Sequence, residues 1–196
     1  QYAIITTKHH DGYAMYHTKQ NDFSVEHSPF GRDITREFLD AMRAEGLRIG
    51  LYYSLSDWHH PDYPAFTEAD KPYEFGRWPK AGPAWNRYRD DMFAQVRELL
   101  TEYGEISVIW FDGFWERNID EWKTADLAKM IRELQPGILI NDRLPREGDF
   151  ETPEHVAIEY PLAGLGSRFA ALLVDGFIAG LLLMAGFMLG VGILYF

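Results

Sequence analysis

An uncharged run from Ile106 to Phe111 leads directly into an acid and a glycine, Asp112 and Gly113. The run is rich in β-branched and aromatic residues, which is typical of a strand buried on both faces of a parallel sheet. Asp112 then stands at the C-terminal end of that strand, and in a parallel α/β barrel this end forms the floor of the active site. We therefore expect Asp112 to take part in chemistry. The alternative is an aspartate that only caps the following turn.

Strand-like and helix-like segments alternate along the chain. We expect strands at 2–6, 48–54, 106–111 and 138–143, and helices at about 33–45, 84–102 and from Asp120 or Thr124 to 134. Such alternation implies right-handed parallel crossovers. The predicted fold class is α/β, a partial (β/α)8 TIM barrel with the central strands only, because 196 residues are fewer than the ~250 of a complete barrel. The strand that begins beside Gln1 also suggests a fragment of a longer protein.

Net charge and the absence of cysteine exclude several classes of function. The formal net charge of -11 argues against a nucleic-acid partner, since phosphate binding needs clustered Lys and Arg. The chain has no cysteine, which excludes disulfides, thiolate catalysis and cysteine-based zinc sites.

The C-terminal stretch differs in character from the rest of the chain. Arg168 and Asp175 are the last charged residues, and the run from Gly176 to Phe196 has none. This run is about as long as the ~20 apolar residues of a membrane-spanning helix. We therefore expect a transmembrane helix at about 170–196 that places the protein at a membrane. The alternative is a buried helix of a soluble core.

Aromatic and polar side chains gather at the predicted strand ends. Trp110 and Asp112 share a face of their strand, since side chains alternate. Aromatic rings beside a carboxylate suit a sugar, whose C–H faces stack on rings while its hydroxyls form hydrogen bonds. The other candidates at strand ends are the pair His9 and His10, the pair Tyr52 and Tyr53 with Trp58, and Arg143, which could also form only a surface ion pair with Asp142.

Glycoside hydrolysis needs a second carboxyl group, which stands ~5–5.5 Å from the nucleophile in a retaining enzyme. The spacing of the sequence does not choose among the four candidates, Glu147, Asp149, Glu151 and Glu154. A metal hydrolase is a further alternative, because paired histidines near acids are compatible with zinc. Its ligands would come from His9, His10, Asp11, His59 and His60.

Five motifs in order resemble the α-L-fucosidases of glycoside hydrolase family 29, over about residues 1–154. They are Lys8–Gly12, Gly50–Ser54 with Asp57-Trp58, Trp110–Gly113, Asn141–Arg143, and Gly148–Phe150 with Thr152–Glu154. The resemblance implies a retaining exo-glycosidase that removes terminal α-L-fucose from glycans and requires no metal or cofactor. It also implies a secreted, periplasmic or lysosomal-type parent protein.

The same resemblance implies roles for single residues. Asp112 matches the nucleophile, and Glu154 matches the acid/base of one branch of the family. The fucose pocket would be lined by His9, His10, Trp110 and Arg143, joined by Tyr52, with Tyr53 as its alternative.

Residues 152–196 resemble instead the start of an RDD-family membrane protein, in which Arg168 and Asp175 fit the first two signature positions. The expected domains are thus a fucosidase barrel fragment at 1–154 and an RDD-like membrane segment at 155–196. Since Thr152-Pro153-Glu154 fits both families, a join at this tripeptide in a misassembled or recombined gene is one hypothesis. The competing function is a catalytically inactive chimera, or a membrane-anchored protein that carries the barrel piece as a passenger.

Overall fold

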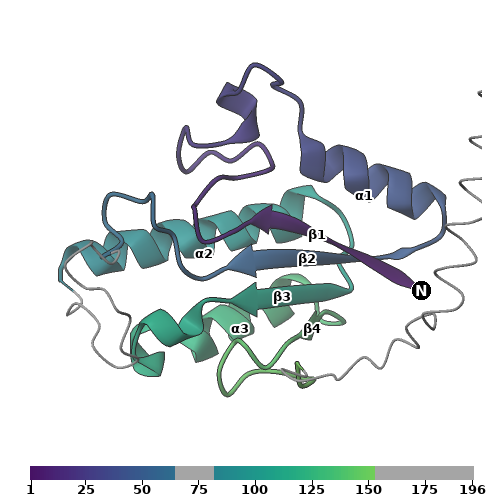
Figure 1. The fold of residues 1–196 in the computed structure, drawn as a ribbon. Helices are drawn as coiled ribbons and strands as arrows, with labels where there is room; N and C mark the ends of the chain where they lie inside the picture. Colours follow the sequence, from purple (N-terminus) through teal and green to yellow (C-terminus); the bar gives the residue numbers. More distant parts are fainter. Residues whose placement is uncertain (65–81, 153–196) are drawn as a thin grey trace, which may run out of the picture. The chain divides into compact units, whose positions relative to one another are not determined.

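The computed structural model describes residues 1–64 and 82–152, and the chain up to Thr152 forms one compact unit (Figure 1). Three predictions lie outside the described residues: Glu154 as acid/base, the RDD-like segment at 155–196 and the transmembrane helix at 170–196. Across the two described ranges, no helix is both long enough and apolar enough to cross a membrane.

The described core is a four-stranded parallel sheet. Its strands are β1 (Tyr2–Lys8), β2 (Arg48–Ser54), β3 (Val108–Asp112) and β4 (Leu139–Ile140), in the order β1-β2-β3-β4. All pairings are parallel, so the strands end at one edge of the sheet (Figure 1). In this register Tyr52 pairs with Trp110, and Ser54 pairs with Asp112. The predicted parallel α/β architecture is confirmed.

Three helices connect the strands: α1 (Ile34–Ala44), α2 (Ala84–Glu102) and α3 (Thr124–Leu134). The predicted cap of α1 is confirmed, because the Asp33 side chain accepts a hydrogen bond from the Arg36 amide at 2.8 Å. The third helix starts at Thr124 rather than at Asp120, which lies in a separate 3₁₀ turn, η4 (Ile119–Glu121).

The last strand is much shorter than the predicted 138–143. Backbone pairing between β3 and β4 stops at Ile140, and the side chain of Asn141 takes its place. The Asn141 Oδ1 accepts from the Phe111 amide at 2.7 Å, and its Nδ2 donates to the Phe111 carbonyl at 3.0 Å. The chain then turns, with the Asp142 amide donating to the Phe150 carbonyl. Arg143 is therefore on a loop and not on a strand.

The two faces of the sheet have different environments. Leu51, Tyr53, Ile109 and Phe111 are buried on the face that α2 and α3 cover (Figure 1). The opposite face includes Tyr52 and Trp110. A cavity of about 960 Å³ reaches this face at Ile4, Val108 and Trp110, but most of its lining comes from the N-terminal ends of the strands and from the chain at the ends of α2 and α3. Gly50 is required on this face, because a Cβ there would lie 2.5 Å from Ile4 Cγ1.

Candidate active site

Asp112 is the last residue of β3, and both of its carboxylate oxygens accept a hydrogen bond. Oδ2 accepts from the Tyr52 hydroxyl at 2.7 Å, and Oδ1 accepts from Arg143 Nη1 at 2.5 Å. The Asp112 side chain is 13% exposed. Charge-assisted bonds of this kind are strong and fix the orientation of the carboxylate. Asp112 is thus held by Tyr52 of β2 and by Arg143 of the loop after β4. An aspartate that only capped the following turn would not need these two partners.

The two adjacent tyrosines of β2 point to opposite faces of the sheet. The Tyr53 hydroxyl donates to Gln95 Oε1 on α2 at 2.7 Å, so Tyr53 belongs to the core. Tyr52 instead faces Asp112, and burial together with that carboxylate raises the pKa of Tyr52 above its ordinary value. Tyr52 therefore remains a neutral hydrogen-bond donor. The His9 ring stacks on the Tyr52 ring, with centroids 5.5 Å apart and planes 7° apart.

His10 lies next to the carboxylate, with Nε2 4.0 Å from Asp112 Oδ2. Its Nδ1 is 2.5 Å from Ser54 Oγ, and Ser54 donates its own proton to the Ser56 carbonyl. The Nδ1 atom must therefore carry the proton of neutral His10, which leaves the Nε2 lone pair toward the site. Burial and the neighbouring His9 lower the pKa of His10, although Asp112 acts in the opposite direction. His10 is accordingly neutral at pH 7.

Gly113 makes the close approach of His10 possible. It has φ +81°, and a Cβ at this position would lie 2.5 Å from Ser56 Oγ and 3.0 Å from His10 Cε1. A side chain here would be strained and would also collide with the histidine. The glycine after Asp112 therefore serves the packing of the site.

Arg143 contacts the interior of the site and not a surface partner. Besides its bond to Asp112, its Cζ lies 5.6 Å from the centroid of the Trp115 ring. Trp110 lies farther back along β3, where its ring is 5.8 Å from Phe150 and lines the cavity beside the sheet. The structure thus gathers Tyr52, His10 and Arg143 around Asp112. His9 stacks on Tyr52, and Trp110 lies two residues before Asp112 on the same face of β3.

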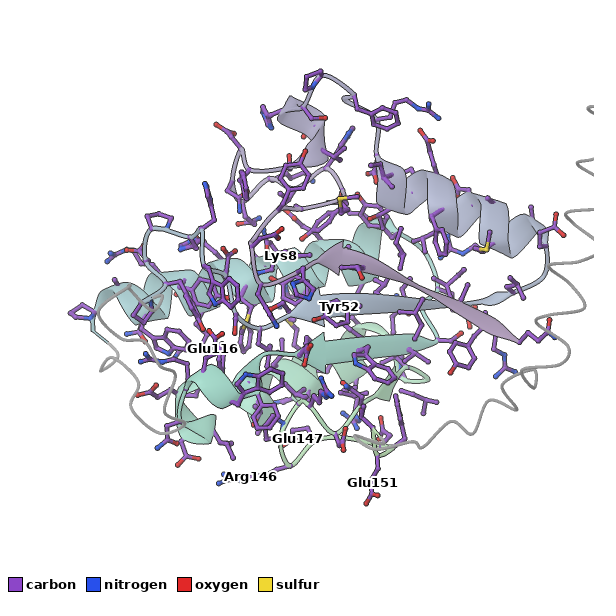
Figure 2. The ribbon with its side chains drawn as sticks, in the orientation of Figure 1. Lys8, Tyr52, Glu116, Arg146, Glu147 and Glu151 are labelled. Carbon is purple, nitrogen blue, oxygen red and sulfur yellow. The ribbon has the colours of Figure 1, made fainter. Side chains whose placement is uncertain are left out.

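The described part of the chain does not supply an obvious second catalytic carboxyl group from the predicted set. Asp149 has a structural role, because it accepts from Arg132 Nη2 at 2.7 Å and from the Ile140 amide at 2.8 Å. Glu147 and Glu151 lie on the chain after β4, and Glu151 points away from the sheet in Figure 2. Glu154 is outside the described residues.

Sequence reasoning missed Glu116, which ends the 3₁₀ turn η3 (Phe114–Glu116). Its Oε1 and Oε2 accept from Trp58 Nε1 at 3.0 and 3.1 Å, and Oε2 also accepts from the Tyr63 hydroxyl at 2.5 Å. Glu116 lies beyond the end of β3 in Figure 2. An acid four residues after the candidate nucleophile, directly after a tryptophan, was the available signal.

The proposed zinc ligands have other partners. The His59 ring stacks on Phe23 with centroids 3.7 Å apart. His60 Nε2 lies 3.0 Å from Asp91 Oδ2, and its Nδ1 accepts from the Asp62 amide. Within residues 1–64 and 82–152, no three His, Asp or Glu side chains form a group that could hold a metal ion.

A strand-end carboxylate held by a tyrosine and an arginine, beside histidines and aromatic rings in a parallel α/β fold, is a site typical of glycoside hydrolases. Comparison with protein families identifies the kind of glycoside hydrolase. Residues 1–163 match the family described as "Alpha-L-fucosidase". The chain belongs to the α-L-fucosidase family.

Individual relatives agree with this assignment. The α-L-fucosidase of Dictyostelium discoideum is 32% identical over 149 residues, which cover 73% of this chain and 30% of that protein. The structure of α-L-fucosidase isoenzyme 1 from Paenibacillus thiaminolyticus is similar with a TM-score of 0.68 and 46% identity, over 78% of this chain and 39% of that one. A Bacteroides thetaiotaomicron family 29 α-L-fucosidase, trapped as a covalent intermediate with 2-fluoro-fucosyl fluoride, gives a TM-score of 0.63 and 32% identity, over 77% and 34% of the two chains. The chain thus spans less than half the length of each of these relatives.

Proposed function

We propose that the protein hydrolyses terminal α-L-fucose from glycans with retention of configuration, and that Asp112 is the nucleophile. The observation that carries this proposal is the Asp112 carboxylate, oriented by Tyr52 and Arg143 at the end of β3. It is supported by the Bacteroides relative that was trapped as a covalent intermediate. The other members of the proposed fucose pocket are His9, His10 and Trp110.

In this mechanism an oxygen of Asp112 forms a bond to the anomeric carbon while the glycosidic C–O bond breaks. A carboxylic acid protonates the departing oxygen, and the resulting carboxylate then takes a proton from the water that releases fucose. Tyr52 and Arg143 keep the nucleophile in one orientation before attack, which removes an entropic cost from the chemical step. We assign the acid/base role to Glu154 on the strength of the family resemblance alone.

The architecture of the whole protein follows from the same proposal. The four parallel strands and their connecting helices represent consecutive units of a (β/α)8 barrel, of which this chain is a part. Its 30% coverage of the Dictyostelium relative supports this view. The family match reaches residue 163, beyond the expected boundary at 154 and into the RDD-like stretch, and so favours a fucosidase origin for 155–163.

Membrane attachment through residues 170–196 stays a prediction from hydropathy. The RDD relationship and the secreted, periplasmic or lysosomal-type location of the parent protein stay predictions from sequence resemblance. Extraction of cell membranes at alkaline pH tests it: a spanning helix keeps the chain in the membrane fraction. Release of the chain into the supernatant would contradict the prediction.

Release of nitrophenol from a nitrophenyl α-L-fucoside by the detergent-solubilised chain tests the function. Asp112→Gly is expected to abolish turnover, whereas Asp22→Gly, at a side chain that is 96% exposed, is the matched control. Proton NMR of the first product should show α-L-fucose before mutarotation. A folded chain without turnover would favour the inactive chimera, and first release of the β anomer would exclude retention.

A further inference from the structure

Trp58 lies beside the site but farther toward solvent than the groups around Asp112. Trp58 as a whole residue is 46% exposed, whereas the side chains of His10 and Asp112 are each 13% exposed. The Trp58 ring is 5.3 Å from the His10 ring at a 45° tilt, and the Trp58 amide donates to the His10 carbonyl at 2.7 Å. Trp58 therefore forms part of the rim of the site.

The indole of Trp58 is fixed by a buried carboxylate. Glu116 is only 6% exposed, and both of its oxygens lie within hydrogen-bond distance of Trp58 Nε1. The Tyr63 hydroxyl is a second donor to Glu116, and Tyr63 is itself 5% exposed. Because donors converge on both oxygens, Glu116 acts as a hydrogen-bond acceptor. The single polar atom of the indole is satisfied, so the exposed part of Trp58 is an apolar ring held in one orientation.

We propose that Trp58 is a stacking subsite for the sugar ring to which fucose is attached, and that Glu116 is the residue that positions it. This inference rests on the proposed function. An exo-hydrolase that holds fucose against Asp112 must direct the departing sugar outward, over the rim. A pyranose presents an apolar C–H face, which stacks on a rigid indole with little loss of side-chain entropy. Trp58 would thus determine which fucosides are good substrates.

The test compares two substrates that differ in what occupies this subsite. α-L-Fucosyl fluoride has a single atom as its leaving group, whereas fucosyl-N-acetylglucosamine disaccharides place a ring there. Of the 1→3, 1→4 and 1→6 linked disaccharides, the assay uses the one that the unsubstituted protein hydrolyses fastest. Trp58→Ala should lower kcat/KM for the disaccharide about two- to tenfold more than for the fluoride, mainly through KM. Trp58→Phe should restore part of this difference.

A second variant tests the positioning role of Glu116. Glu116→Gln replaces one acceptor oxygen by an NH₂ group, so it should also raise KM for the disaccharide more than for the fluoride. Phe30→Ala, at another exposed aromatic residue (52%), is the matched control and should leave the ratio of the two substrates unchanged.

The outcomes separate this inference from the proposed function. Equal losses for both substrates in Trp58→Ala would show that Trp58 acts only through the fold or His10, and this would overturn the subsite. Hydrolysis of the fluoride without hydrolysis of any disaccharide would overturn it as well. A parent protein that hydrolyses neither substrate would instead contradict the proposed function, and the inference with it.

Discussion

Lys8 Nζ lies 3.2 Å from Asp57 Oδ2, and the two side chains are 0% and 3% exposed. The ammonium group also lies 4.6 Å from the centroid of the Tyr53 ring. Asp57 Oδ1 accepts from the amides of His59 and His60. The pair therefore ties the end of β1, just before His9 and His10, to the loop that carries Trp58.

Lys8→Met should lower the free energy of unfolding by about 3–5 kcal/mol, because it leaves the Asp57 carboxylate buried without its cation. Denaturant unfolding measures the change. The double variant Lys8→Met with Asp57→Asn removes the orphaned charge while an amide oxygen still accepts the loop amides. It should be more stable than Lys8→Met alone, and a double variant of equal or lower stability would argue against the buried pair as the cause.

Tyr52→Phe should reduce kcat/KM for a nitrophenyl fucoside by about 10- to 100-fold, which corresponds to the loss of one hydrogen bond to a charged group. Steady-state kinetics at pH 7 checks this value. Tyr53→Phe is the matched control on the opposite face: it removes the bond to Gln95 and should lower stability by about 1 kcal/mol, with kcat little changed. A similar loss of activity in both variants would show that Tyr52 acts through the fold.

Gly113→Ala combines backbone strain with a collision and should reduce both stability and activity. Gly46 separates the two effects, because it also has a positive φ of +72° but nothing within 4 Å of an added Cβ. Gly46→Ala should therefore cost about 1 kcal/mol of stability and leave the kinetics unchanged. If Gly113→Ala were as mild as Gly46→Ala, the proposed contact with His10 and Ser56 would be wrong.

The lowered pKa of His10 predicts a specific dependence of stability on pH. Below the ordinary histidine pKa of 6.5 the unfolded chain takes up a proton that folded His10 resists, so stability falls as the pH decreases. The stability that neutral His10 contributes is fully present above pH 6.5, and it is lost as the pH falls from 6.5 toward the lowered pKa of folded His10. His10→Gln should weaken the fall between pH 7 and pH 5, measured by denaturant unfolding at both values. An unchanged slope would show that His10 titrates normally.

Residue patterns in the sequence were sufficient for much of the fold. Alternating strands and helices, the Asp33 cap and the strand that ends at Asp112 follow from local rules, since each depends on neighbours in the chain. The choice between Tyr52 and Tyr53 needed the contact of Tyr53 with Gln95 of α2, which lies 42 residues later in the sequence. Glu116 was missed because a 3₁₀ turn, rather than a strand end, brings it to the site.

The carboxamide of Asn141 uses both of its polar atoms on the main chain of Phe111. A side chain thus imitates one residue of a neighbouring strand, and the sheet ends there without leaving Phe111 unpaired. The segment after Asn141 no longer pairs in register with β3, although its first residues keep their positions. A change in the length of the loop beyond Arg143 need not, therefore, move the guanidinium away from the carboxylate of Asp112.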